Sequence, residues 1–144
     1  IEGTFAKIYF HRLLGNSFSR NDDISINHML NYGYAIILST FNRELISLGY
    51  NLQLGIHHDN GTNQFNLSYD LLEPFRPFID EIVYFLKEKQ LDKETKSILA
   101  NIINNSCVYN GKHYLIKDAI RIYCKDIMTE IIQGNDLVRS ISFE

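Results

Sequence analysis

The sequence is short of three features that would point to particular classes of protein. Its two cysteines, Cys107 and Cys124, are too few and too irregularly spaced for a disulfide framework or a zinc cluster. No apolar run approaches the ~20 residues of a membrane-spanning helix. The net charge of -3 lacks the basic excess of a protein that coats nucleic acid. We therefore expect a protein of the reducing cytoplasm, in which any contact with a polyanion is confined to a local basic patch.

The chain also begins without a methionine and without the basic start and apolar stretch of a secretory signal. Instead, "IEGTFAKIYFHRLL" opens directly in a helical pattern, so we expect a piece of a longer protein. The 144 residues, 45% of them hydrophobic, suffice for one packed domain. We therefore treat residues 1–144 as a single domain.

Apolar residues recur at helical spacing through most of the chain. This periodicity predicts an all-α fold, a compact helical domain of about five main helices. Gly49 is expected to end one helix and Asp92 to cap another. The helices are expected over about residues 1–14, 25–48, 67–90, 92–104 and 115–133.

Three segments break the helical pattern. Residues 50–66 have no steady period, and a loop of that length between two helices is usually functional or disordered. Around Asn110-Gly111, the stretch "VYNGKHY" fits a small hairpin or a plain turn equally well. The last ten residues are expected to form a loosely held tail.

Both prolines of the chain lie in "YDLLEPFRPFID", residues 69–80, together with a row of charged residues. Asp70, Glu73 and Arg76 are spaced three apart, which on a helix places them along one stripe. A structural interpretation makes Asp70 and Glu73 a capping box and pairs Arg76 with Glu73 or Asp80. A functional interpretation notes that neighbouring carboxylates repel each other, and that a divalent cation removes this repulsion.

The irregular loop before this stripe contains His57, His58 and Asp59. Because the loop leads directly into the acidic helix, we expect one histidine to lie near the acids. A histidine combined with carboxylate oxygens suits manganese or magnesium better than zinc. Glu2 is a further candidate ligand, although a first-turn acid is also favoured by the helix dipole alone.

Four segments in register carry a resemblance to a known family. They are "IEGTFAKIYF", "LNYGYAI", "LGYNLQLGIHHDN" and "FNLSYDLLEPFRPFID". In this order and at these separations they resemble the C-terminal catalytic domain of the CRISPR-associated adaptation integrases ("Cas one"), in the form found in systems that contain Cas9. The resemblance runs from Ile1 to about Ile131.

The resemblance implies a metal site and a reaction. The family's metal ligands correspond to Glu2, His58 and Glu73, which would hold Mn²⁺ or Mg²⁺. Asp70 matches a second acid of the site, which would orient ligands or take part in acid–base steps, and Arg76 lies where the family has a basic residue near a DNA phosphate. The implied function is that of a metal-dependent DNA endonuclease and integrase, which joins prespacer 3′-OH ends to the CRISPR repeat by transesterification.

The resemblance also implies partners and a missing part. The family has an N-terminal β-rich dimerisation domain that this chain lacks. Glu2 is therefore expected at a fraying end, and we expect a weakened or empty metal site, so that this chain alone could be inactive. The implied partners are double-stranded DNA, a second copy of the full-length protein and the companion adaptation subunit ("Cas two"). Cas9 and an end-binding ring protein are further partners implied for this type of system.

A row of basic residues, Lys117, Arg121 and Lys125, shares one face of the last expected helix. It is either a solvated face balanced by Asp118 and Asp126 or a surface that contacts DNA phosphates. An alternative function for the whole chain also stays open: a helical DNA-binding or scaffolding module without chemistry of its own.

Overall fold

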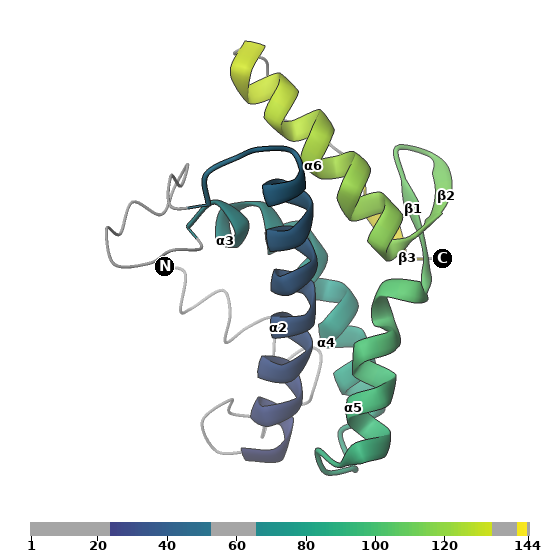
Figure 1. Ribbon diagram of the computed structural model, residues 1–144. Coiled ribbons are helices and arrows are strands. Elements are labelled where there is room, and N and C mark those ends of the chain that lie inside the picture. Colours follow the sequence, from purple (N-terminus) through teal and green to yellow (C-terminus); the bar gives the residue numbers. More distant parts are fainter. Residues whose placement is uncertain (1–23, 53–65, 134–140, 144) are drawn as a thin grey trace, which may run out of the picture.

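The computed structural model describes residues 24–52, 66–133 and 141–143 (Figure 1). Within these ranges the fold is helical, which confirms the predicted all-α class. The helix expected over residues 1–14 and most of the loop expected over residues 50–66 lie outside the described ranges. The helices are α2 (Ile24–Ser47), α3 (Asn66–Leu72), α4 (Arg76–Phe85), α5 (Lys93–Ala100) and α6 (Ile116–Gln133), with 3-10 turns η1 (Glu73–Phe75) and η2 (Asn101–Asn104) and strands β1 (Ser106–Tyr109), β2 (Lys112–Leu115) and β3 (Ile141–Phe143).

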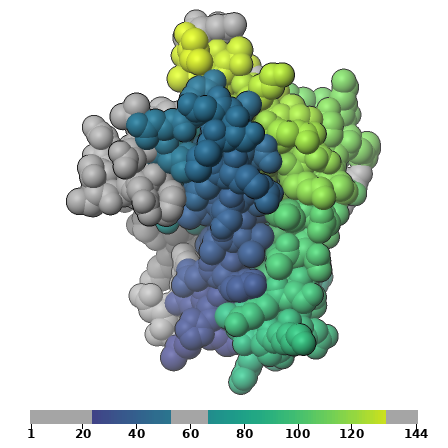
Figure 2. All heavy atoms as spheres, viewed as in Figure 1, coloured from purple at the N-terminus to yellow at the C-terminus, as the bar shows by residue number. Residues whose placement is uncertain are grey.

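Helix α2 is the element around which the other described helices pack. It contacts α3, α4, α5 and α6. In Figure 1, α5 lies beside the first half of α2 and α6 crosses near its end; Figure 2 shows the atoms of these three helices forming one continuous surface. The predicted end of α2 is confirmed: Gly49 has a φ of 87°, and the Tyr50 N–H donates to the Leu45 carbonyl at 3.0 Å.

Three aromatic rings in the core pack α2 and α6 against the turn η1, which carries Glu73 of the stripe. Phe75 lies edge-to-face against Phe41 of α2 and against Tyr123 of α6, each with a centroid distance of 5.3 Å. Phe41 and Tyr123 also meet edge-to-face, at 6.1 Å. Such pairs add to the hydrophobic burial of the rings. Because Phe75 is fully buried, it fixes the turn η1 to the core.

The helix expected over residues 67–90 is instead divided. Helix α3 ends at Leu72, η1 follows, and α4 runs from Arg76 to Phe85. Pro74 and Pro77 each lack a backbone N–H, which removes a donor from the helical ladder at this point. Asp70 lies inside α3 rather than at a helix start, so the capping-box interpretation of Asp70 and Glu73 was wrong.

One local prediction is confirmed, and one open alternative is resolved in favour of a hairpin. The Asp92 carboxylate caps α5 by accepting from the Thr95 N–H at 2.9 Å, and the Thr95 hydroxyl accepts from the Asp92 N–H at 2.8 Å. The hairpin is present, and Asn110 and Gly111 in its two-residue turn have φ of 49° and 77°. Positive φ at both positions is typical of the type I′ turn.

The described sheet has a third strand that the sequence did not predict. Strand β3 pairs antiparallel with β1, with Val108 opposite Ser142, so the strand order is β2-β1-β3. The expected loosely held tail was therefore wrong for residues 141–143. None of the helices in the described ranges has the length and apolarity that a bilayer crossing requires.

Candidate functional site

The acidic stripe forms a direct ion pair at the junction between η1 and α4. The Nε of Arg76 lies 2.9 Å from the Oε2 of Glu73, and the two side chains are 31% and 53% exposed. Residues three apart eclipse each other in a 3-10 turn, which brings these two side chains together. The predicted pairing of Arg76 with Glu73 is confirmed, and the Glu73 carboxylate remains accessible to solvent.

Arg76 also lies against an aromatic ring on the neighbouring helix. Its guanidinium carbon is 4.8 Å from the centre of the Tyr34 ring, within the range of a cation–π contact. The Tyr34 hydroxyl donates a hydrogen bond to Oδ1 of Asp80, a carboxylate only 4% exposed. Four residues of α2, η1 and α4 therefore form one chain of polar contacts from the core to the surface.

A glycine allows this close approach of α2 to α4. A Cβ atom built on Gly33 would lie 2.6 Å from Cγ2 and 2.9 Å from Cδ1 of Ile79. Any larger residue would push the two helices apart, and Tyr34 is the next residue along α2. Gly33 thus sets the distance across which Tyr34 reaches Asp80.

Asp70 lies one turn before Glu73, half-buried in α3. That helix is held to α2 by the Ser68 hydroxyl, which donates to Oδ1 of Asn42. The Leu67 N–H donates to the Leu52 carbonyl at 2.9 Å and fastens the start of the helix. Asp70 is therefore on a well-anchored element directly before the ion pair.

The other predicted ligands, Glu2 and His58, lie outside the described residues, as do His57 and Asp59. In the described part of the chain no group of three His, Cys, Asp or Glu side chains could hold a metal ion. The predicted three-ligand set therefore stays a prediction. The ligand that is described fits it, because the Glu73 carboxylate is an accessible hard oxygen donor of the kind that Mn²⁺ and Mg²⁺ prefer.

The basic row of α6 is only partly balanced by its acidic neighbours. Nη2 of Arg121 lies 3.5 Å from Oδ1 of Asp118, and the Arg121 side chain is exposed. Asp126 accepts a hydrogen bond from the Tyr109 hydroxyl at 3.0 Å, which ties it to the sheet. Lys125 is exposed and Lys117 half-buried. The described geometry agrees with a solvated face and also leaves this row accessible to a phosphate backbone.

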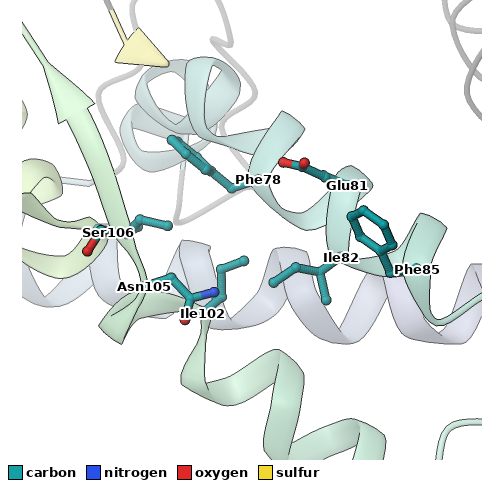
Figure 3. A pocket seen from close by; sticks show the side chains of 8 residues that line it. Phe78, Glu81, Ile82, Phe85, Ile102, Asn105 and Ser106 are labelled. Atoms are coloured by element: carbon teal, nitrogen blue, oxygen red, sulfur yellow. The ribbon is translucent and has the colours of Figure 1, made fainter. Parts of the chain in front are cut away.

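A small hollow lies beside α4 (Figure 3). It has a volume of about 210 Å³ and is lined by Phe78, Ile82 and Phe85 of α4 and by Ile102 beyond them. Ligand pockets usually measure roughly 300–1,000 Å³. Around the axis of α4, the lining residues of the hollow lie about half a turn from Arg76 and Asp80. The hollow therefore faces the opposite side of α4 and is separate from the candidate site.

Comparison with known proteins places the chain among CRISPR-associated proteins. The family model for the CRISPR associated protein Cas1 matches residues 1–103, most of the chain. The chain therefore belongs to the Cas1 family.

Two curated relatives show how much of a Cas1 protein the chain covers. The CRISPR-associated endonuclease Cas1 of Neisseria meningitidis is 40% identical over 88 residues, which are 61% of this chain and 29% of the relative. A CRISPR-associated endonuclease Cas1 of Francisella tularensis subsp. novicida is 30% identical over 139 residues, covering 83% of this chain and 44% of the relative. The chain thus spans less than half the length of these relatives.

The structure also shows a partly buried polar contact beside the candidate site that the sequence did not predict. In the sequence, Tyr34 falls at helical spacing among the apolar residues of its helix, and Asp80 is expected only as one of two alternative partners for Arg76. Their hydrogen bond joins residues 46 apart in the chain, and no local pattern indicates it. The sequence offers only a weak signal, because Asp80 is one of two adjacent acids in the otherwise apolar run "PFIDEIVYF".

Proposed function

We propose that this chain is the catalytic part of a metal-dependent DNA endonuclease and integrase that acts in CRISPR spacer acquisition. The observation that carries the proposal is the solvent-accessible Glu73 carboxylate next to the Arg76 guanidinium, on a turn anchored by Phe75. An acid and a base side by side suit a site that handles both a cation and a phosphate. Membership of the Cas1 family, whose compared relatives are named endonucleases, supports it.

In this proposal Glu2, His58 and Glu73 hold Mn²⁺ or Mg²⁺. When bound, such a cation polarises a phosphodiester and lowers the pKa of the attacking hydroxyl or water. Asp70 orients the ligands from α3. Arg76 donates to a phosphate oxygen, where it offsets the charge that develops as the phosphorus is attacked.

The bond changes in the proposed reaction balance without an external energy source. The 3′-hydroxyl of a prespacer end gives up its proton as its oxygen attacks a phosphorus of the repeat, and one phosphodiester forms as another breaks. The leaving 3′-oxygen of the repeat strand takes up one proton, so no net proton is consumed or released. Water in place of the 3′-hydroxyl gives hydrolysis, the endonuclease activity.

The basic row of α6 is proposed to contact phosphates of the same DNA. Replacing Lys117, Arg121 and Lys125 by glutamine should weaken DNA binding and reduce its salt dependence, by about one unit of slope for each phosphate that the variant no longer neutralises. An unchanged slope would assign the row to a solvated helix face. The partners proposed for the full-length protein are double-stranded DNA, a second copy of itself and the companion adaptation subunit, with Cas9 and an end-binding ring protein.

The proposal is tested in the full-length protein, where Glu2 is not at a chain end, by replacing Glu73 with glutamine and measuring both Mn²⁺ affinity and cation-dependent cleavage of DNA. Glu81→Gln is a matched control, because Glu81 is on α4 but lines the separate hollow. We expect Glu73→Gln to weaken cation binding at least about 10-fold and to abolish cleavage. Glu81→Gln should change neither.

A non-catalytic DNA-binding or scaffolding module is the competing function, and the Glu73–Arg76 pair is an observation that it also explains. In that case Glu73→Gln removes only a surface ion pair, which contributes about 0.2–1 kcal/mol to stability. Unchanged cation affinity in Glu73→Gln would therefore favour the module and overturn the proposed chemistry.

A further inference from the structure

We infer that Tyr34 and Asp80 are positioning residues, which together form a seat that holds the Arg76 guanidinium beside Glu73. The seat is defined by described contacts alone. Its role in presenting Arg76 to a phosphate rests on the function proposed above. Neither residue belongs to the acidic stripe or to the predicted metal ligands.

An ion pair at the surface does not by itself fix an arginine side chain. Exposed pairs gain little because water screens the charges and the long side chain loses conformational freedom. Arg76 is held at a second point, where its guanidinium carbon lies 4.8 Å from the centre of the Tyr34 ring. Since the guanidinium is planar and weakly hydrated, a ring face is a favourable surface for it.

The Tyr34 ring is in turn fixed by its hydroxyl. That hydroxyl donates to Oδ1 of Asp80, which is almost completely buried. A hydrogen bond to a carboxylate is stronger than one between neutral groups. Asp80 lies one turn after Arg76 on the same helix, so the contacts run from α4 to α2 and back to α4.

These contacts restrict where the guanidinium lies. Helix α2 supplies the ring, α4 supplies both the arginine and the carboxylate that orients the ring, and Gly33 keeps the two helices close. Arg76 is therefore held before any DNA arrives. A preorganised charge costs no rearrangement at the moment of reaction.

The seat is tested by NMR on the whole chain, through the Nε–Hε signal of Arg76. Tyr34→Leu removes the ring, and Tyr34→Phe keeps the ring but removes its hydrogen bond to Asp80. The matched control is Tyr32→Leu, because Tyr32 is on the same helix and has Lys96 5.9 Å above its ring.

We expect Tyr34→Leu to move the Arg76 signal and to speed its solvent exchange about 2- to 5-fold. Tyr34→Phe should give a smaller change in the same direction, and Tyr32→Leu none. A wild-type Arg76 signal in folded Tyr34→Leu would overturn the seat. If Tyr34→Leu does not fold, Tyr34→Phe decides, and an unchanged exchange rate there overturns the seat.

DNA affinity separates this inference from the proposed function. Tyr34→Leu should weaken DNA binding about 2- to 5-fold while Mn²⁺ affinity stays at the wild-type value, since no predicted metal ligand is altered. A moved Arg76 signal with unchanged DNA affinity would overturn the role of Arg76 at a phosphate, although the seat itself would stand.

Discussion

Replacing Gly33 by alanine is predicted to destabilise the protein, although alanine favours a helix over glycine by about 1 kcal/mol. The new Cβ would lie 2.6 Å from Cγ2 of Ile79. Ile79 is completely buried, and its Cγ2 is attached to the branched Cβ, so it cannot swing aside without moving the helix. Overpacking of this kind costs about 1–3 kcal/mol. The expected net result is a loss of about 1 kcal/mol in the free energy of unfolding.

The same substitution should have the opposite sign when Ile79 is replaced by alanine. Ile79→Ala alone should cost about 2–5 kcal/mol because it leaves a cavity between α2 and α4. In that background the atoms that clash with the new Cβ are absent. Gly33→Ala should then stabilise the protein by up to about 1 kcal/mol, the helix-propensity gain.

Urea denaturation followed by circular dichroism measures all four proteins of this cycle. The coupling energy between positions 33 and 79 is the effect of Gly33→Ala in the wild type minus its effect in the Ile79→Ala background. Residues in contact typically have coupling energies of about 0.5–3 kcal/mol. Equal effects of Gly33→Ala in both backgrounds would refute the close approach of α2 to α4. The arrangement that brings Tyr34 to Asp80 would then also be wrong.

Three further predictions concern single residues. The Asp92 carboxylate accepts from the Thr95 N–H, which holds the pKa of Asp92 below its usual value. The stabilising effect of the ionised carboxylate should therefore be complete above pH ~4 and be lost as the pH falls through the lowered pKa. In urea titrations at acid pH, the stability difference between wild type and Asp92→Asn should shrink. Burial, with a smaller contribution from Glu44, raises the pKa of the Cys124 thiol to about 12, so the native protein should leave Cys124 unmodified by a thiol reagent at pH 8 and react only in urea. Gly111→Ala should destabilise the hairpin by about 1–2 kcal/mol because φ at that position is 77°, and calorimetric melting would show it.

The parts of the fold that local patterns specify were predictable. Helices α2 and α6 have long apolar periods, and α5 has a cap, so their existence and approximate ends followed from the sequence. The break between α3 and α4 did not, because Leu72, Phe75 and Ile79 keep a helical period across the prolines. Strand β3 was missed because its partner β1 is more than 30 residues earlier in the chain.

The contacts of the candidate site were likewise predictable only where they depend on local spacing. The contact between Glu73 and Arg76 followed from their spacing of three, which is a local property. The bond from Tyr34 to Asp80 did not, since it depends on how closely two helices pack. Glu2 and His58 were selected by resemblance, and their meeting with Glu73 stays a prediction.

The central claim is that the Glu73 carboxylate helps to bind a divalent cation, and crystals soaked in Mn²⁺ test it most directly. Anomalous diffraction locates manganese independently of any assumption about its ligands. We predict one anomalous peak within coordination distance of the Glu73 carboxylate, with His58 and Glu2 as its other ligands. Ordered side chains at all three positions that lie far apart, with no peak at Glu73, would contradict it.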